Sequence, residues 1–417
     1  MRSLALKKLG ELSQRKDAVV SGPFGSNLKV SDYKNEGVPI LRLQNIGKGF
    51  FIDKDIKFIS EKKAEELKYH SFVSGDIALA KLGIPVGKTC IIPNYLKSGI
   101  ITADVVRIRP DKNVMDYKFL EYFLNTDLSV SQLTGNISGA TRPRVNLSDV
   151  RDIKIPVPPL LKQQRIVAIL DEAFAAIAKA KANAEQNFKN AKELFESYLH
   201  KVFESKGEGW EETVLKNEID LLVGFAFKSK AYTEAEDDIL LLRGDNIMQG
   251  GLRWENAKRW KKTEYEDYKK YQLQENDIVL AMDRPWVKAG LKVARLLKND
   301  LPALLVQRTA CLRANQNLDN SLLFYMLKSK GFINYLIDVQ TGIGVPHISG
   351  QQILDFKFNK PSINTQQDIV LKLDALSAET KKLEAIYQAI INNLDELKKS
   401  ILQKTFSGEL TKAEVAA

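Results

Sequence analysis

Hydrophobic and polar positions follow two kinds of pattern along the chain. Residues 1–159 and 207–363 contain short apolar or alternating runs, such as DIALAKL and VVRIRP, separated by Gly, Pro and Asn. Runs of this length between turn residues are typical of β-strands. Within the first stretch, DYKFLEYFLNT at 116–126 instead has the apolar spacing of a helix. Residues 160–206 and 364–417 contain no proline and no strand pattern, and they predict two long helices.

Both predicted helices place their apolar residues in alternating steps of three and four, which is the heptad pattern of a coiled coil. The seam of the first helix consists of Phe174, Ile177, Lys181, Ala184, Phe188, Ala191, Phe195, Tyr198 and Val202. The seam of the second helix consists of Ile369, Leu373, Leu376, Thr380, Leu383, Tyr387, Ile390, Leu394, Leu397 and Ile401. A single exposed stripe of this length would promote aggregation. We therefore expect the helices to pair antiparallel within the chain; self-association through the same seams is the alternative.

The chain repeats itself once, at a spacing of about 200 residues. VPILRLQNIG at 38–47 returns as ILLLRGDNIM at 239–248, and FVSGDIALAK, from Phe72, returns as LQENDIVLAM. PVPPLLKQQRIVAILD at 156–171 and NKPSINTQQDIVLKLD at 359–374 are identical at seven of sixteen positions. The spacing grows between these matches, so we expect extra residues in a loop of the second copy near Trp286.

The duplication and the two helices together predict an α+β fold with two β-rich domains. We expect domain 1 at residues 1–159, the first long helix at 160–206, domain 2 at 207–363, and the second long helix with a C-terminal tail at 364–417. An antiparallel pairing of the helices would relate the two halves by an approximate two-fold axis and place the domains at opposite ends of the pair.

Charge and composition narrow the functional class only slightly. The net charge of +10 is concentrated in residues 1–159, which carry 25 Lys and Arg against 17 Asp and Glu. Residues 207–363 carry 22 against 21, so a general basic surface for nucleic acid is expected in the first half alone. No apolar run approaches a membrane span, and the start MRSLALKKLGEL is too polar for a secretory signal. We expect a cytoplasmic protein that does not enter a membrane.

Two candidate catalytic or metal motifs fail on their details. MDRPW at 282–286 is similar to the tetrad with which amino-methyltransferases hold a target base, but Arg284 replaces its first proline and no glycine-rich cofactor loop accompanies it. PDKNVMDYK at 110–118 imitates a nuclease metal motif, yet the second copy keeps only Asp319 opposite Asp116, where an aspartate would cap the following helix.

Histidines and cysteines offer no third option. The three histidines are dispersed along the chain, and Cys90 and Cys311 lie singly in apolar surroundings, where we expect buried core residues. We predict no catalytic residues, no metal and no cofactor bound by this chain.

The duplicated plan resembles that of the specificity subunits of Type I restriction-modification enzymes. The most specific parts of the resemblance are IPVPPLLKQQRIVAILD at 155–171 and the closing helix ending SILQKTFSGEL at 400–410. In that family each half is a target-recognition domain followed by a conserved helix, and the two helices form an antiparallel coiled coil. The second copy departs from the pattern where NKPSINTQQD replaces two prolines, which makes the junction at residue 363 less regular.

The resemblance also implies partners and cofactors. Each domain would recognise one part of a split double-stranded DNA site. The partners would be two modification subunits, which bring S-adenosylmethionine, and in the nuclease form two restriction subunits that use ATP with Mg²⁺. The chain itself would be a non-catalytic subunit.

Candidate DNA contacts are polar residues in turns and loops, because Arg, Lys, Asn and Gln bind base edges while Ser, Thr and basic side chains bind phosphates. In the first half we select Arg42, Gln44, Asn45, Lys81, Lys88, Thr141, Arg142, Arg144 and Asn146. In the second half we select Arg243, Asp245, Asn246, Arg284, Lys288, His347 and Ser349. Different polar residues on a repeated frame are what two different half-sites require.

A function of another class is also compatible with the sequence. The nearly neutral second half favours a tandem-domain scaffold whose coiled coil binds protein partners instead of DNA. DNA binding by the chain, alone or with a methyltransferase partner, discriminates between the two functions.

Overall fold

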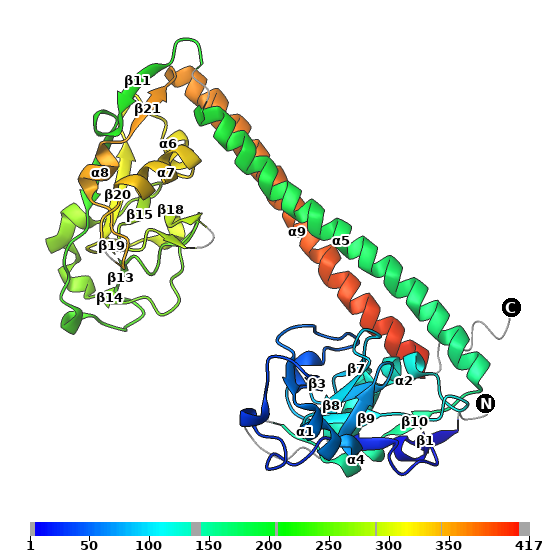
Figure 1. The fold of residues 1–417 in the computed structure, drawn as a ribbon. Coiled ribbons are helices and arrows are strands. Elements are labelled where there is room, and N and C mark those ends of the chain that lie inside the picture. The colour runs from blue at the N-terminus through cyan, green and yellow to red at the C-terminus, as the bar shows by residue number, and fades with distance from the viewer. Residues whose placement is uncertain (1–4, 135–142, 205–206, 288–289, 343, 408–417) are drawn as a thin grey trace. The chain divides into compact units, whose positions relative to one another are not determined.

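The computed structural model describes residues 5–134, 143–204, 207–287, 290–342 and 344–407. Contacts divide the chain into two compact units, residues 1–184 with 389–417 and residues 185–388. Each unit contains one β-rich domain together with parts of both long helices, α5 and α9 (Figure 1). We call the β-rich part before α5 domain 1 and the β-rich part between α5 and α9 domain 2.

Domain 1 consists of two four-stranded sheets and a two-stranded sheet that joins its entry to its exit. The first sheet has the order β2-β9-β6-β7, the second β4-β3-β8-β5, and β1 pairs antiparallel with β10. The strands are β1 (Leu6–Lys8), β2 (Val19–Ser21), β3 (Val38–Leu41), β4 (Lys57–Ile59), β5 (Ser71–Val73), β6 (Ile77–Ala80), β7 (Thr89–Ile91), β8 (Ser98–Ile101), β9 (Val105–Ile108) and β10 (Lys154–Pro156). The helices are α1 (Glu61–Glu66), α2 (Tyr117–Leu124), α3 (Asp127–Thr134) and α4 (Leu147–Arg151).

Domain 2 repeats this plan in the same chain order. Its sheets are β12-β20-β15-β18 and β14-β13-β19, and β11 pairs antiparallel with β21 as β1 does with β10. The strands are β11 (Glu211–Val214), β12 (Ile219–Val223), β13 (Ile239–Leu242), β14 (Arg259–Trp260), β15 (Ile278–Ala281), β16 (Trp286–Val287), β17 (Gly290–Leu291), β18 (Val293–Arg295), β19 (Ala303–Leu305), β20 (Thr309–Ala314) and β21 (Lys357–Lys360). The helices are α6 (Asn320–Leu327), α7 (Lys330–Val339) and α8 (Gly350–Leu354).

Local predictions from the repeat are confirmed in both domains. Asp116 caps α2 by accepting hydrogen bonds from the backbone amides of Lys118 and Phe119, and Asp319 caps α6 in the same way. Both cysteines are buried, as expected. Near Trp286, where we expected extra residues in a loop, the short strands β16 and β17 pair antiparallel.

The long helices span Leu160–Glu204 (α5) and Ile363–Ser407 (α9), 45 residues each. They pack against each other antiparallel, with an ion pair between Lys181 and Asp395 at 2.7 Å in the first unit. In the second unit Lys192 lies 4.0 Å from Glu384, which fits the same register. The predicted helical pairing is therefore confirmed.

The predicted seam is wrong at two positions of α9. Every predicted seam residue of α5 is buried or half-buried, but on α9 Ile390 is 38% exposed and Leu397 is 46% exposed. Ile391 is half-buried in place of Ile390. A straight helix drifts by about 20° per heptad relative to a strict seven-residue repeat, so the contact stripe moves to the neighbouring residue.

Helices and domains share their cores within each unit. In the first unit Leu170 of α5 and Phe406 of α9 belong to the main apolar core of domain 1, with Phe119 and Phe123 of α2. In the second unit Val370 of α9 and Phe203 of α5 pack against the main core of domain 2. Each domain is thus fixed to segments of both helices.

Candidate nucleic-acid interface

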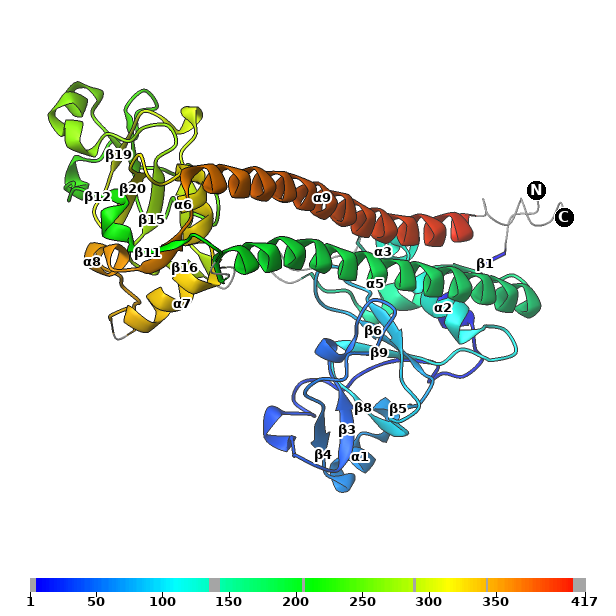
Figure 2. The same ribbon diagram turned by 90° about the horizontal axis from the view of Figure 1, so that it is seen from above.

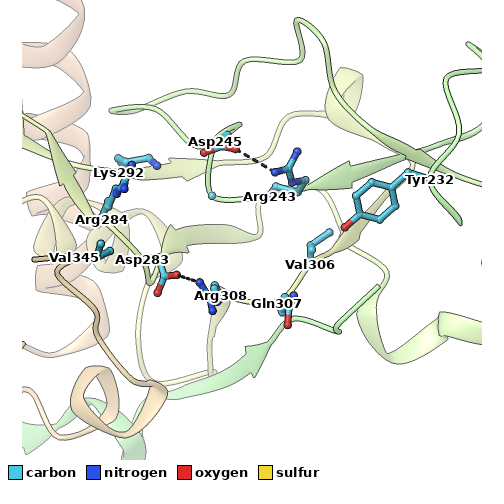
Figure 3. A pocket seen from close by; sticks show the side chains of 11 residues that line it. Tyr232, Arg243, Asp245, Asp283, Arg284, Lys292, Val306, Gln307, Arg308 and Val345 are labelled. Carbon is cyan, nitrogen blue, oxygen red and sulfur yellow. Dashed lines mark hydrogen bonds and ion pairs between the residues drawn. The ribbon is translucent and has the colours of Figure 1, made fainter. Parts of the chain in front are cut away.

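Polar side chains gather in domain 2 at the ends of several strands, around a pocket of 440 Å³ (Figure 3). Arg243 follows β13, Asp283 and Arg284 follow β15, and Arg308 lies in the turn between β19 and β20. The segment before α8 closes the same site, because the backbone amide of Arg284 donates to Pro346 and that of Ile348 donates to Met282. Four separate chain segments therefore deliver side chains to one hollow.

A small ionic network orders the centre of this pocket. Asp283 accepts from Arg308 at 2.6 Å and pairs with Nδ1 of His347 at 2.5 Å. Burial acts to raise the pKa of Asp283, but the hydrogen bonds with His347 and Arg308 and their charge lower it from its ordinary value. Asp283 is thus a carboxylate that orients His347 and Arg308, and Figure 3 shows its contact with Arg308.

Basic side chains exceed acidic ones around the pocket. Arg243, Arg284, Lys292 and Arg308 line it, against Asp245 and Asp283. Lys292 is half-buried, and this burial lowers the pKa of its ammonium group. Arg284 and Arg308 have left-handed backbone conformations, with φ of 44° and 65°. Such strain in exposed arginines is typical of positions that serve a function.

Domain 1 has the equivalent site with different side chains. A pocket of 260 Å³ is lined by Tyr33, Arg42, Gln44, Thr102 and Asp104, among others. Asp55 accepts hydrogen bonds from Arg42 and Gln44 at 2.8 and 3.2 Å, and these, after the hydrogen bond from Lys57, lower the pKa of its carboxyl.

The loop before α4 brings Arg144 to this place, as the loop before α8 brings His347 in domain 2. Val145 donates to the carbonyl of Lys81, and Arg144 pairs with Asp104 at 2.8 Å. Lys81 is buried and donates to Ser21 at 2.5 Å, and burial together with the charge of Arg144 lowers its pKa. The two loops are held in the same way, because Ile348 donates to the carbonyl of Met282 as Val145 donates to that of Lys81.

Three sequence-selected residues have structural roles. Asn45 is fully buried, accepts from the backbone amide of Arg42 and donates to the carbonyls of Ile52 and Lys54. Asn246 repeats this arrangement with Arg243 and Arg253. Ser349 caps α8 by accepting from the amide of Gln352 at 3.2 Å.

The other selected residues differ in exposure. The exposed ones are Gln44, Arg144, Asn146, Asp245 and Arg284, the half-buried ones are Arg42, Lys88, Arg243 and His347, and Lys81 is buried. Thr141, Arg142 and Lys288 lie outside the described residues. Sequence reasoning missed Lys292 and Arg308. Lys292 was detectable from the hairpin register, because its carbonyl accepts from Ala281 as that of Lys88 accepts from Ala80.

Neither a metal centre nor a membrane span is found in the part of the chain that the structure describes. No cluster of three or more His, Cys, Asp or Glu side chains there could hold a metal ion. None of the helices in the described ranges is both long and apolar enough to cross a bilayer.

Comparison with known proteins gives one consistent result. A family model described as "Type I restriction modification DNA specificity domain" matches residues 23–186 and 207–392. The chain is 28% identical over 328 residues to the Type I restriction enzyme MjaVIII specificity subunit of Methanocaldococcus jannaschii, covering 75% of each chain. It is 39% identical over 180 residues to the EcoAI specificity subunit of Escherichia coli, covering 43% of this chain and 30% of that one.

Solved structures share the fold across nearly the whole chain. The HsdS subunit of Thermoanaerobacter tengcongensis matches with a TM-score of 0.61 at 18% identity, covering 97% of each chain. A chain from a study of complex assembly and conformational transition of the type I R-M system matches with a TM-score of 0.76, also at 18% identity, covering 97% of this chain and 98% of that one.

Proposed function

Because the chain belongs to the DNA specificity subunits of Type I restriction-modification systems, which are non-catalytic, we propose that each β-rich domain recognises one half of a split DNA target through its strand-end site. The observation that carries this proposal is the repetition of the site. The same backbone frame presents Gln44 and Arg144 in domain 1 but Asp245 and His347 in domain 2, while an arginine, Arg42 or Arg243, is common to both sites. Two half-sites of different sequence require such a difference.

The proposed contacts follow from exposure and position. They are the exposed or half-buried selected residues of the two sites, with Lys292 and Arg308 added: Arg42, Gln44, Lys88, Arg144, Asn146, Arg243, Asp245, Arg284, Lys292, Arg308 and His347. Thr141, Arg142 and Lys288 remain in the proposal on their sequence alone. Asn45, Asn246 and Ser349 are left out, because their side chains are committed to turns and a helix cap. Lys81 is left out as well, because it is buried and its ammonium group donates a hydrogen bond to Ser21.

Partners and cofactors complete the proposal. The chain binds double-stranded DNA and docks two modification subunits, which carry S-adenosylmethionine. In the nuclease form it also docks two restriction subunits, which use ATP with Mg²⁺. The assembly works in the cytoplasm. A protein-binding scaffold is the competing function, and the near balance of charge in residues 207–363 is what favours it.

The first test is activity with and without partners. The purified chain is expected neither to methylate nor to cut DNA, and addition of modification subunits is expected to produce methylation at a split, non-palindromic site. Gel shifts and methylated-base mapping measure both. Methyl transfer by the isolated chain would refute the non-catalytic role, and no DNA binding in either state would favour the scaffold.

Replacing one arginine tests the site in domain 1. The Arg144→Ala variant is expected to methylate more weakly, through the loss of one base contact at one position of one half-site. Such a contact from arginine is worth about 1 to 3 kcal/mol. Arg308→Ala should do the same at the other half-site. The measurement is methylation kinetics over substrates with single base changes.

A matched control separates DNA contact from a general loss of charge. Lys8 forms an exposed ion pair with Asp152 at 2.7 Å, in the same domain but outside the pocket. Lys8→Ala should leave the base preference unchanged. Equal kinetics of the Arg144→Ala and Lys8→Ala variants on all substrates would remove the loop before α4 from the interface.

A further inference from the structure

A buried glutamine near the start of each long helix forms hydrogen bonds with the domain that precedes the helix. Gln163 of α5 accepts from the backbone amide of Asp116 at 2.8 Å and donates to the carbonyls of Val114 and Pro158 at 3.0 and 2.8 Å. All its hydrogen bonds go to the loop before α2 or to the approach of its own helix. The side chain is fully buried, so breaking this set would leave polar groups without water.

The second repeat contains the same set of hydrogen bonds. Gln366 of α9 accepts from the amide of Asp319 at 2.7 Å and donates to Asn317 and Pro361 at 3.0 and 2.9 Å. It too is fully buried. Two copies of one geometry, both at the repeated Gln-Gln-x-Ile-Val motif, indicate a shared structural requirement.

A tyrosine makes a second connection about two turns further along each helix. Tyr122 of α2 donates to the carboxylate of Asp171 on α5, and Tyr325 of α6 donates to Asp374 on α9 at 2.5 Å. Burial, then the adjacent carboxylate, raises the pKa of both phenols.

Phenylalanines of α5 support the two tyrosines. The ring of Phe174 lies 5.4 Å from that of Tyr122, and the ring of Phe195 lies 6.0 Å from that of Tyr325. Lys398 lies over Phe174 at 5.1 Å, and Lys328 over Phe195 at 5.6 Å. Each tyrosine is therefore held on its ring as well as through its hydroxyl.

The third contact of each domain is with the end of the other long helix. Phe406 of α9 lies 5.1 and 5.3 Å from Phe119 and Phe123 of α2, and Figure 1 shows α2 beside this end of α9. Phe203, near the end of α5, packs with Leu199 and Leu373 beside Tyr325 in the second unit. Figure 2 shows α6 next to the first turns of α9. Each domain thus contacts the start of the long helix that follows it in the chain and the end of the other long helix.

We propose that these three contacts form a clamp that makes each domain rigid with its segment of the helix pair, and that Tyr122 and Tyr325 are positioning residues that set the tolerance for the gap between half-sites. The inference rests on the proposed recognition of a split target. A DNA substrate whose half-sites are separated by the wrong gap is bound only if the junction between a domain and the helix pair deforms. The stiffness of that junction therefore determines how strongly wrong gaps are rejected. No tyrosine of the clamp touches the strand-end sites.

The test removes the hydroxyls and keeps the rings. The double variant Tyr122→Phe with Tyr325→Phe, in the full chain assembled with modification subunits, should methylate the preferred gap normally. Its discrimination against gaps one base pair longer or shorter should fall about tenfold, which corresponds to 1.4 kcal/mol. Base preference inside each half-site should not change. Tyr335→Phe is the matched control, because that hydroxyl donates to Gln352 at 2.8 Å within domain 2 and has no part in the clamp.

A second measurement on the chain alone does not depend on DNA. Spin labels at Leu297→Cys and Leu371→Cys, both exposed and both in the second unit, report the motion of domain 2 against α9. The native cysteines are buried, and burial raises the pKa of Cys90 to about 12, so labelling is selective. The distance distribution should broaden with Tyr325→Phe and with Phe203→Ala, but not with Tyr335→Phe.

The outcomes separate the clamp from the split-target proposal. Unchanged distributions together with unchanged gap discrimination would overturn the clamp while the split target stands. Broadened distributions with unchanged discrimination would overturn the positioning role. A wild-type complex that methylates every gap equally would reject the split target, and the spin labels would still decide whether the clamp is rigid.

Discussion

Exchange of domain 1 for the equivalent domain of another Type I specificity subunit is expected to replace one half of the DNA target and leave the other half unchanged. Each mismatched base pair costs about 1 to 3 kcal/mol, so the original half-site should be lost and not merely weakened. The exchange should leave the rest of the fold intact, because β1 and β10 pair antiparallel and bring the first and last strands of the domain together. Mapping of methylated bases over a genome measures both halves at once.

The design of the chimera must respect the shared core. Phe406 of α9 packs against Phe119 and Phe123 of domain 1, so the donor domain needs large apolar residues at these two positions. The reciprocal exchange of residues 207–363, between β11 and β21, is the matched control and should alter only the other half-site. A chimera in which both half-sites change together would show that the domains do not recognise DNA independently.

The architecture was predictable because its signals are local and occur twice. The heptad steps and the repeated Gln-Gln-x-Ile-Val motif lie within short stretches, and a helix depends mainly on residues three and four positions apart. Even so, the strict heptad fails at Ile390 and Leu397, because the drift of a straight helix accumulates and cannot be assigned to a position without the partner helix.

The site was predictable only in outline, because sequence does not distinguish a donor that faces DNA from one that closes a turn. Asn45 and Asn246 illustrate this: both are polar, both follow an apolar strand, and both are buried in equivalent turns. Their identity in the two repeats was the available clue. A residue that is the same in both copies cannot distinguish two half-sites, whereas Arg144 and His347 differ at equivalent positions.

Arg308 was missed for a different reason. Its place beside Asp283 arises from the pairing of β15 with β20, which joins segments separated by another strand pair in sequence. The left-handed conformation of Arg308 also leaves no mark in the sequence, because that backbone region is usually occupied by glycine or asparagine.

Lengthening both long helices is expected to lengthen the gap between the recognised half-sites. The ion pairs of Lys181 with Asp395 and of Lys192 with Glu384 give the register, which places Leu394 opposite Ala182. Four residues inserted before Leu394 and four after Ala182 add about 6 Å of helix, comparable to nearly two base pairs at about 3.4 Å each. The preferred gap should increase by one or two base pairs, measured by methylation of substrates that differ only in the gap.

Helical phase makes this test sharper. Four residues rotate the following part of a helix by about 40° beyond a full turn, and each added base pair turns a half-site by roughly a tenth of a turn, so affinity should fall as the gap changes. Seven residues in each helix preserve the heptad seam and add about 10.5 Å, which predicts a gap about three base pairs longer. Insertion into one helix alone should break the register and prevent assembly. A paired insertion that folds, binds modification subunits and still prefers the original gap would show that the helix pair does not set the spacing.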